Sequence, residues 1–519
     1  MQRLDALTLG AALPLWDEAA LRQRERVACT ALPPDTLMRR AGAAVAALAR
    51  ARFAAARRIG ILCGPGNNGG DGLEAAACLA KAGCAVDVVL VGCGSSAPWS
   101  ARGTGWHAAL QRALDAGVQP RRWDGALPAG CDLLLDALLG IGLREAPRGA
   151  LADALRALRA RVVPLLAVDL PSGLHADSGA TPGECAGADV TLSLLGLKPG
   201  LFGASAACGE LWVDDLGVDD CGARPAARLV AATDALRALG DPAAAAHKGQ
   251  RGDVRVFGGA DGMGGALLLA ARAALALGAG RVYAASLDPA APLLDSHAPE
   301  LMLRRPDALL AQLGAARADS PQCTVFGPGS GTSKDALALL DALVAIDRPL
   351  VLDADALNLL AAQPRDGSLW AALRARRVPA WLTPHPQEAA RLLRCDAGAV
   401  QADRLRAARA LAAHGVVCVL KGAGSVIATP DGACAVNPSG NGLLATAGSG
   451  DVLAGALGAL LARAETPLAA GQAAVWLHGA AADLARPRRP TLRAGELGDW
   501  MLRAWHVLRR ARGAPSRAG

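Results

Sequence analysis

The chain has 519 residues, of which 52% are hydrophobic, 19% charged and 3% aromatic, and its formal net charge at pH 7 is +7. This composition excludes a mainly disordered chain, and the length predicts two to four domains, each large enough for a core of its own. The longest uncharged stretches, 432–450 and 466–482, are interrupted by Gly, Asn, Gln or His. They lack the ~20 predominantly apolar residues of a membrane span, so we expect a soluble protein.

The basic residues are very unequally divided. Of the 54, five are Lys and 49 are Arg. The arginines are scattered along predicted helices and aromatic residues are few, so the sequence does not indicate nucleic-acid binding. In a chain that so favours Arg, a Lys suggests a position that Arg cannot fill. Lys198 and Lys421 lie in motifs described below, and Lys248 lies in the loop His247-Lys248-Gly249.

The N-terminus only partly resembles a secretory signal peptide. Arg3 precedes the apolar run 6–16, but Asp5 stands before that run, Asp17 and Glu18 close it, and no small-residue cleavage site follows. The 13 cysteines are an odd number and include no Cys-x-x-Cys pair. This pattern favours reduced thiols over a disulfide framework or a zinc site, and we expect a cytoplasmic protein.

Apolar periodicity predicts two helices followed by strands that alternate with helices. The helices cover Glu18–Thr30 and Asp35–Arg52. A strand at Ile59–Cys63 then leads through the loop 64–72 into a helix that ends at Ala82. Further strands are expected at Ala85–Val91, Leu133–Leu135, Pro164–Val168 and Val190–Leu195. This alternation predicts a parallel sheet with its ligands at the carboxyl ends of the strands.

The loop 64–72 contains five glycines in nine residues. Its free N–H groups and the positive N-terminus of the next helix suit a phosphate. Asn67 and Asn68 add amide oxygens that can ligate a cation. A tight turn between strand and helix is the structural alternative.

Asp136 and Asp169 each follow an apolar strand and lie next to a Gly-containing loop. At the carboxyl edge of one sheet they would converge with Asn68, although an isolated Asp at such a place is often a helix N-cap. Oxygen ligands from these side chains and Ser172 suit a hard cation rather than zinc. Lys198 follows the last of these strands.

These motifs, in this order, resemble the NAD(P)H-hydrate epimerase domain. The resemblance rests on Gly-Asn-Asn-Gly-Gly-Asp-Gly at 66–72, Asp-Ala-Leu-Leu-Gly-Ile-Gly-Leu at 136–143, Val-Asp-Leu-Pro-Ser-Gly at 168–173, and Ala-Asp-Val-Thr followed by Leu-Lys-Pro-Gly at 188–200. It covers residues 1–222 and implies a Rossmann-like fold. That family inverts the configuration at the hydrated carbon of damaged NADH or NADPH.

The resemblance also implies roles for individual residues. Asn68, Asp136 and Ser172 would hold K⁺, and Asp169 would act as acid or base at the reacting ring, a role that suits a carboxylate. The substrate contacts would be Asn67, Asn68, Gly69, Gly70, Asp71, Gly140, Ile141, Gly142, Leu143, Arg144, Glu145, Ala146 and Asp169. Ala77 and Cys78 depart from the family, which has Arg and a larger polar residue there.

A break in the pattern falls at residues 217–247. Gly217–Pro225 is polar and turn-forming, and Gly240–Ala246 consists mostly of Gly, Pro and Ala. A second alternating pattern begins with a strand at Val254–Phe257. Its later strands are expected at Val282–Ala285, Cys323–Phe326, Leu350–Leu352, Ala380–Leu382 and Val416–Leu420. The sequence therefore predicts two α/β domains.

The second half carries three chemical signals. The first signal is the run Asn437–Asn441 followed by Ala445–Asp451, which opens an apolar helix. The small residues 447–450 leave N–H groups free to form an anion hole at the N-terminus of that helix. Asp451 could accept a proton from a substrate hydroxyl there, although a capped helix also favours Asp in its first turn. Lys421–Ser425 follows a strand and suits a nucleotide phosphate or ribose, but it is not a P-loop. His385 lies in a Pro-framed loop, where a ligand contact and a structural role are equally good explanations.

Together with Gly327–Gly331 and Asp353–Asn358, these signals resemble the ADP-dependent NAD(P)H-hydrate dehydratase domain, over residues 228–510. The resemblance implies a ribokinase-like α/β fold. The hydrated cofactor would contact Ala266, Gly331, His385 and Asp451, with Asp451 catalytic. The adenine nucleotide would contact Lys421, Gly422, Ala423, Gly424, Ser425 and Gly450. Mg²⁺ would support the phosphoryl step. Met263, Gln387 and Ala447 depart from the family pattern.

The leading hypothesis is a bifunctional repair enzyme. It would interconvert the R and S forms of NADHX and NADPHX and dehydrate the S form at the expense of ADP, giving AMP and phosphate. We expect no nucleic acid or membrane partner. We expect the protein to form a homo-oligomer. The alternative is a ribokinase-like kinase of a small hydroxylated metabolite with a non-catalytic nucleotide-binding N-terminal domain.

Overall fold

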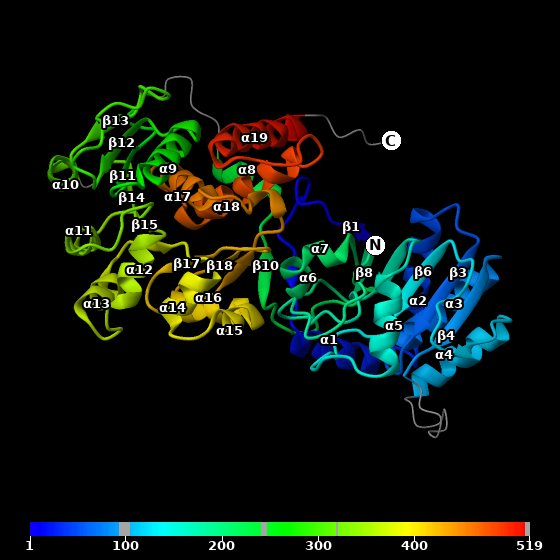
Figure 1. Ribbon diagram of the computed structural model, residues 1–519. Coiled ribbons are helices and arrows are strands. Elements are labelled where there is room, and N and C mark those ends of the chain that lie inside the picture. Colours follow the sequence, from blue (N-terminus) through cyan, green and yellow to red (C-terminus); the bar gives the residue numbers. More distant parts are fainter. Residues whose placement is uncertain (93–103, 240–246, 318–319, 514–519) are drawn as a thin grey trace. The chain divides into compact units, whose positions relative to one another are not determined.

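The computed structural model describes residues 1–92, 104–239, 247–317 and 320–513 (Figure 1). The chain forms two compact units. The first contains Met1–Asp5 and Pro14–Ala227, and the second contains Ala6–Leu13 and the residues from Arg228 onward. The Gly- and Pro-rich stretch 240–246 lies outside the described residues. The segment 6–13 joins the second unit through backbone bonds such as those from Leu229 N to Leu13 O and from Ala232 N to Leu9 O.

The first unit is built on one sheet with the strand order β1-β9-β8-β7-β6-β3-β4-β5. Neighbouring strands are parallel except for β1 and β9. The strands are β1 (Gln2–Arg3), β3 (Arg58–Cys63), β4 (Ala85–Leu90), β5 (Arg121–Arg122), β6 (Leu133–Ala137), β7 (Leu165–Val168), β8 (Val190–Leu194) and β9 (Glu210–Asp214), and the unit also holds the short β2 (Pro14–Leu15).

Helices cover both faces of this sheet, as the alternation of its side chains requires. Ile61 and Val88 pack with the helices α2, α3 and α4 on one face, while Leu62 and Val89 pack with α5 on the other. The helices are α1 (Glu18–Ala31), α2 (Thr36–Arg52), α3 (Asn67–Lys81), α4 (Thr104–Asp115), α5 (Ala150–Arg159), α6 (Gly200–Gly203) and α7 (Ser205–Cys208).

The predicted loop 64–72 is wrong in one respect, because the helix α3 already begins at Asn67. The glycines that suggested a loop serve close packing instead. A Cβ on Gly69 would lie 2.0 Å from the carbonyl oxygen of Gly64, and one on Gly72 would lie 2.5 Å from Cβ of Ala137 in β6. The other strands and helices predicted for this half are confirmed to within a few residues, and Asp136 lies inside the end of β6 rather than after it.

Within the second unit the strand order is β13-β12-β11-β14-β15-β16-β17-β18-β19-β10. The strands are parallel except where β18 pairs with β17 and with β19. They are β10 (Ala227–Leu229), β11 (Asp253–Gly258), β12 (Arg281–Ser286), β13 (Met302–Arg304), β14 (Gln322–Phe326), β15 (Leu350–Leu352), β16 (Trp381–Leu382), β17 (Val417–Leu420), β18 (Val426–Ala428) and β19 (Cys434–Val436). All six strands predicted for this half are confirmed. The strands that were not predicted are short segments whose apolar residues show no clear periodicity.

The helix α17 (Ser449–Leu461) is buried over most of its length and packs between the sheet and α9 (Gly264–Ala276). Small residues allow this approach, since a Cβ on Gly455 would lie 1.9 Å from the carbonyl oxygen of Ala270. The other helices are α8 (Ala232–Leu239), α10 (Pro306–Ala315), α11 (Lys334–Ala345), α12 (Asp355–Ala362), α13 (Ser368–Ala375), α14 (Pro386–Leu393), α15 (Ala397–Ala402), α16 (Arg404–Ala412), α18 (Pro467–Ala485) and α19 (Leu497–Gly513), with the 3₁₀ turns η2 (Gly442–Leu444) and η3 (Ala494–Glu496).

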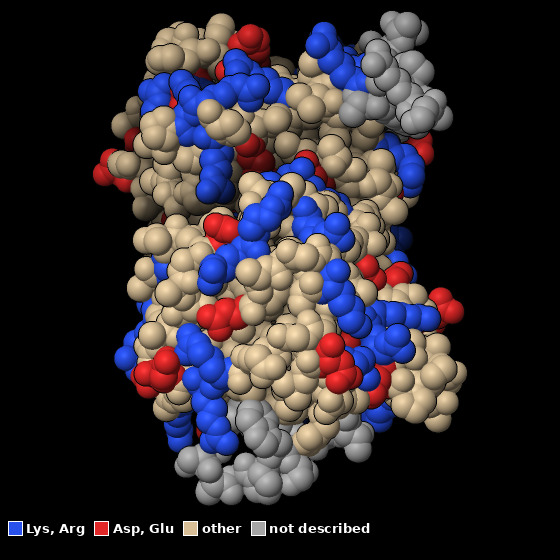
Figure 2. All heavy atoms as spheres, turned by 90° about the vertical axis from the view of Figure 1, so that its right-hand side faces the viewer, with Lys and Arg blue, Asp and Glu red and all other residues tan. Residues whose placement is uncertain are grey.

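The surface carries charges of both signs. On the face drawn in Figure 2, Lys and Arg side chains are spread over the surface with Asp and Glu between them. Among the described residues, no helix is both long enough and apolar enough to span a bilayer.

The contact between α17 and α9 predicts opposite outcomes for two Gly-to-Ala changes. Gly455→Ala adds a methyl group where backbone already lies, and we expect it to lower the free energy of unfolding by about 1–3 kcal/mol. Gly314→Ala, in α10 with open space around it, removes only the helix penalty of Gly and should raise stability by up to ~1 kcal/mol. Urea unfolding followed by circular dichroism measures both. Equal effects would contradict the close packing at Gly455.

Candidate functional site

The first unit has a cavity of about 480 Å³ at the carboxyl ends of its strands. Asn67, Asn68 and Asp71 reach it from the first turns of α3, and Asp169 reaches it from the end of β7. The loop after β6 contributes Gly140–Leu143. The structure thus brings together at one sheet edge the residues that the sequence predicted to converge.

Three of the predicted ligands form a buried cluster beside this cavity. Asp136 Oδ1 accepts a hydrogen bond from Ser172 Oγ at 2.6 Å, and its Oδ2 accepts one from Ser172 N at 2.8 Å. Asn68 Nδ2 donates to the carbonyl oxygen of Leu139 at 3.0 Å. Burial raises the pKa of Asp136, while the bonds from Ser172 oppose that shift. Asn68 Oδ1 is buried and has no hydrogen-bond partner in the described part of the chain. The cluster therefore offers an oxygen that is ready for a ligand.

Asp169 is held by a buried lysine. Lys198 is 1% exposed, and its Nζ pairs with Asp169 Oδ1 and donates to the carbonyl oxygen of Leu194 at 2.7 Å. Burial lowers the pKa of Lys198, and the Asp169 carboxylate opposes this shift. Asp169 itself adopts a left-handed backbone with φ 69°, a conformation that is rare for Asp and often found at functional sites. Its Oδ2 lies 3.2 Å from the position of a Cβ on Gly140, so a side chain there would crowd it.

Asp71 lines the same cavity as Asp169 but has no comparable cation partner among the described ion pairs. Burial, followed by the charges of Asp169 and Glu25, raises the pKa of Asp71 well above its usual range. The cavity therefore combines a carboxylate paired with an ammonium group and a carboxyl group that favours its protonated form. Such a pair can supply both an acid and a base.

Other predicted contacts of this half lie outside the cavity lining. Gly70 faces α2, since a Cβ there would lie 2.6 Å from the thioether of Met38, and Gly69 packs against the backbone of Gly64 as described above. Arg144, Glu145 and Ala146 do not line the cavity either, and their roles stay predictions. The cavity has further lining residues that were not among the predicted contacts. Pro65, Gly66, Leu138, Leu139, Leu194 and Leu195 belong to motifs or strands already noted, whereas Arg22, Glu25, Leu37, Met38, Ala41 and Leu216 come from α1, α2 and the segment after β9.

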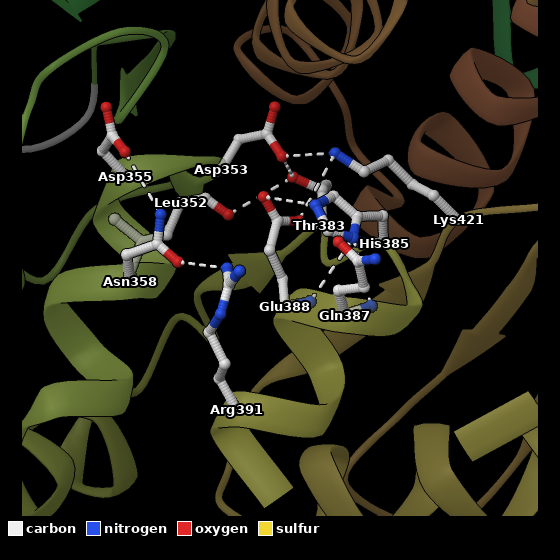
Figure 3. Close-up of polar contacts among 10 residues, drawn as sticks. All are labelled: Leu352, Asp353, Asp355, Asn358, Thr383, His385, Gln387, Glu388, Arg391 and Lys421. Atoms are coloured by element: carbon white, nitrogen blue, oxygen red, sulfur yellow. Dashed lines mark hydrogen bonds and ion pairs between the residues drawn. The ribbon is translucent and has the colours of Figure 1, made fainter. Parts of the chain in front are cut away.

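The second unit has a polar cluster at the carboxyl ends of β15, β16 and β17 (Figure 3). Asp353 is 1% exposed, and its Oδ1 accepts from Lys421 Nζ and from Thr383 Oγ1, both at 2.7 Å. Burial opposes the charge on Lys421, but the carboxylates of Asp353 and Glu388 outweigh it and raise the pKa of Lys421. The cluster thus holds a charged lysine at the start of the predicted nucleotide loop.

His385 and Glu388 form a capping box at the N-terminus of α14. His385 N donates to Glu388 Oε2 at 2.8 Å, and His385 Nδ1 accepts from Gln387 N at 3.1 Å. Burial raises the pKa of Glu388 to about 7, although Lys421 opposes the shift. Gln387, which departs from the family motif, contributes only its backbone N–H to these bonds, so the cap tolerates its side chain.

Asp451 lies in the first turn of α17, close to this cluster. Burial, followed by the charge of Asp353, raises the pKa of Asp451 to about 7, while Lys421 opposes the shift. Gly450 lies close to the lysine, since a Cβ there would lie 3.1 Å from Lys421 Nζ. Gly448 caps the helix with φ 87°, whereas Ala447 has no positive φ. The Gly-to-Ala departure at 447 is therefore compatible with this turn.

Gly331 lies in the loop after β14, and Ala266 lies in the first turn of α9. Gly331 has φ 66° and donates its N–H to Asp355 Oδ2 at 2.9 Å. Ala266 lies in α9, and its Cβ is 3.1 Å from the position of a Cβ on Gly329. Asp355 is also among the charges that raise the pKa of Asp451. The same carboxylate therefore binds the N–H of Gly331 and acts on Asp451.

The run Asn437–Asn441 has a structural role. Asn437 Nδ2 donates to Val475 O at 3.2 Å, Ser439 Oγ donates to Trp476 O at 2.9 Å, and Gly440 N donates to Asp483 Oδ2 at 2.8 Å. These bonds fix the run to α18. Three residues central to the cluster, Asp353, Thr383 and Glu388, were not among the predicted site residues. Asp353 and Thr383 each follow directly after a strand, which was the available signal for those two, and Asp353 also lies in the motif 353–358.

Comparison with known proteins shows matches to both units. Residues 254–500 match the family described as NAD(P)H-hydrate dehydratase, and residues 34–200 match that described as YjeF-related protein N-terminus. The chain is 38% identical to the bifunctional NAD(P)H-hydrate repair enzyme Nnr of Escherichia coli, covering 91% of this chain and 90% of that protein. It is 37% identical to the enzyme of the same name from Coxiella burnetii, covering 91% and 94%.

A solved structure covers the second half. It is the ADP/ATP-dependent NAD(P)H-hydrate dehydratase from Bacillus subtilis co-crystallized with ATP/Mg²⁺, at 33% identity and a TM-score of 0.47, covering 53% of this chain and 96% of that one.

The pair of Lys198 and Asp169 predicts a specific pattern of stabilities. Lys198→Met leaves a largely buried carboxylate without its cation, and we expect it to lower the free energy of unfolding by about 3–5 kcal/mol. The double variant Lys198→Met with Asp169→Asn removes the orphaned charge and should lose less than the single variant. Denaturant unfolding of both proteins tests this order. A double variant less stable than Lys198→Met would contradict the ion pair.

Proposed function

The chain belongs to the family of bifunctional NAD(P)H-hydrate repair enzymes, and we propose that its first unit epimerises hydrated NADH and NADPH while its second unit dehydrates the S form. The single observation that carries this proposal is the presence, in each unit, of a Lys-paired carboxylate beside a second acidic group at the carboxyl edge of a sheet. A kinase with a non-catalytic N-terminal domain is disfavoured, because the similarity to repair enzymes extends over both units.

In the first unit we assign Asp169 and Asp71 to the cavity that receives the hydrated ring. Asp169 Oδ1 is engaged by Lys198 and by Leu194 N, which leaves Oδ2 for the ligand. A carboxylate in this position can accept a proton while the carbon–oxygen or carbon–nitrogen bond at the hydrated carbon opens and reforms on the other face. Gly140 leaves room for this oxygen, since a Cβ there would lie 3.2 Å from Asp169 Oδ2.

Potassium fits the residues beside this cavity. Asn68, Asp136 and Ser172 present oxygen atoms only, and the orphaned Oδ1 of Asn68 would gain a partner. A bound K⁺ would supply a positive charge near the anionic dinucleotide.

In the second unit we assign Asp451 as the base. It would take the proton of the ring hydroxyl as that oxygen attacks the terminal phosphorus of ADP, and AMP would leave with the electrons of the broken P–O bond. The phosphate group then departs from the ring carbon with the electron pair of the carbon–oxygen bond. Loss of a proton from the neighbouring carbon restores the double bond. Phosphorylation matters because hydroxide is a poor leaving group and phosphate a good one.

ADP would lie on the loop Lys421–Ser425 and reach Gly450 at the start of α17. Mg²⁺ commonly binds through substrate phosphates and one or two carboxylates, and Asp353 Oδ2, which Lys421 and Thr383 leave open, fits that need. Among the described residues no three His, Cys, Asp or Glu side chains are grouped to hold a metal by themselves. Bound Mg²⁺ would neutralise charge on the phosphates. The cytoplasmic location and the homo-oligomer stay predictions.

Incubation with separate R and S epimers of NADHX tests both assignments. With ADP, the wild-type protein should return both epimers to NADH, which absorbance follows directly. Asp169→Asn should return only the S form, and Asp451→Asn should interconvert the epimers without forming NADH. Failure of the wild type to form NADH in the presence of ADP would overturn the proposal, and wild-type epimerisation by Asp169→Asn would remove that residue from catalysis.

The raised pKa of Asp451 predicts the pH dependence of dehydration. A base must be deprotonated, so kcat/KM should fall about tenfold per pH unit below about 7 and level off above it. Asp353, Asp355, Glu388 and Lys421 are the charged groups that act on Asp451. Since the pKa of Glu388 is also about 7, Glu388→Gln is the control. The acidic limb should persist in that variant, and its loss would assign the limb to Glu388 instead.

A further inference from the structure

A buried arginine lies directly beneath the loop to which we assign ADP. Arg404 opens the helix α16 and is 8% exposed. Its Nη2 donates to the carbonyl oxygens of Leu420 and Lys421, both at 3.2 Å, and its Nη1 donates to Gln401 Oε1 at 2.7 Å. The guanidinium group therefore binds the backbone carbonyl oxygens at the point where β17 ends and the loop begins.

The loop is shaped to receive this side chain. Gly422 has φ 135°, and a Cβ on it would lie 3.1 Å from both terminal nitrogens of Arg404. Any other residue at 422 would be strained and would also crowd the guanidinium group. The glycine is needed here for the approach of Arg404, as well as for the approach of any ligand.

The bond to the Lys421 carbonyl fixes the direction of one peptide group. In a trans peptide the C=O and N–H point to opposite sides. Because the oxygen of Lys421 points toward Arg404, the N–H of Gly422 points away from it. A backbone N–H in this position can donate to a phosphate oxygen.

The charge on Arg404 has no anionic partner. No carboxylate pairs with it in the described part of the chain, and its Nε is buried without a hydrogen-bond partner. Burial lowers the pKa of Arg404 to about 10, and only the Cys418 thiol opposes that shift. The guanidinium group remains charged at neutral pH, so the loop rests on an uncompensated positive charge. A bound polyphosphate would compensate it.

We propose that Arg404 is a positioning residue of the nucleotide site, which turns the peptide between Lys421 and Gly422 toward the phosphates of ADP and adds an unpaired positive charge beneath them. This inference rests on the assignment of ADP to the loop Lys421–Ser425. It concerns a residue that does not itself touch the ligand.

The test compares three variants of the full-length chain, with ADP as the titrated probe in calorimetry. Arg404→Met removes both the bonds and the charge, and we expect the dissociation constant and the KM for ADP to rise on the order of 10- to 100-fold. The KM for the S form of NADHX should stay within about twofold of the wild type. Arg404→Lys keeps the charge but loses the two terminal nitrogens of the guanidinium group. It should therefore restore part of the affinity for ADP that Arg404→Met loses.

Arg376 provides the matched control. It is likewise buried, at 9% exposure, and its Nη1 donates to the carbonyl oxygens of Val344 at 2.6 Å and Ile346 at 2.8 Å, at the end of α11. Arg376→Met should lower the melting temperature but leave the affinity for ADP unchanged.

The outcomes separate the two hypotheses. If the wild type binds ADP and Arg404→Met binds it equally well, the role of Arg404 is overturned and the proposed function stands. If Arg404→Met weakens ADP and NADHX alike, as a general loss of structure would, the role is also overturned. If the wild type binds no ADP, the proposed nucleotide site fails, and this inference fails with it.

Discussion

A lysine–aspartate pair withdrawn from water at the carboxyl edge of each sheet is the interaction on which both sites depend. Lys198 pairs with Asp169 in the first unit, and Lys421 pairs with Asp353 in the second. Removing such charges from water is costly unless further hydrogen bonds satisfy them. In the first unit, Leu194 supplies its N–H to Asp169 and its carbonyl oxygen to Lys198, and in the second, Thr383 supplies its hydroxyl to Asp353.

The two pairs show how Lys and Arg differ in this chain. A compact ammonium group fits where a strand end leaves little room, whereas a planar guanidinium suits several carbonyl oxygens at once. Arg24, Arg376 and Arg404 all serve in the second way, each donating to backbone carbonyls in its own unit. Lys198 and Lys421, two of the five lysines, lie in the two candidate sites. Lys248 does not line either cluster, and its side chain is exposed.

Much of this arrangement could be predicted from local pattern. Apolar runs revealed the central strands, and the polar residues at or just after their ends, such as Asp136 and Asp169, revealed the sheet edge. What local pattern could not provide were contacts made across the chain. Thr383 reaches Asp353 across 30 positions and Lys421 reaches it across 68. The glycines at 69–72 were misread as a loop because close helix–strand packing and a flexible turn demand the same residue.

The two Lys–Asp pairs have different effects because the second acidic group of each site is placed differently relative to its pair. In the first unit the paired carboxylate itself borders the cavity, beside Asp71, and Lys198 fixes its orientation. In the second unit both ends of the pair act on a neighbour. Asp353 raises the pKa of Asp451 while Lys421 restrains that rise, and burial brings the result to about 7. A base with a pKa near neutral combines a useful population of its deprotonated form with a strong driving force for proton transfer.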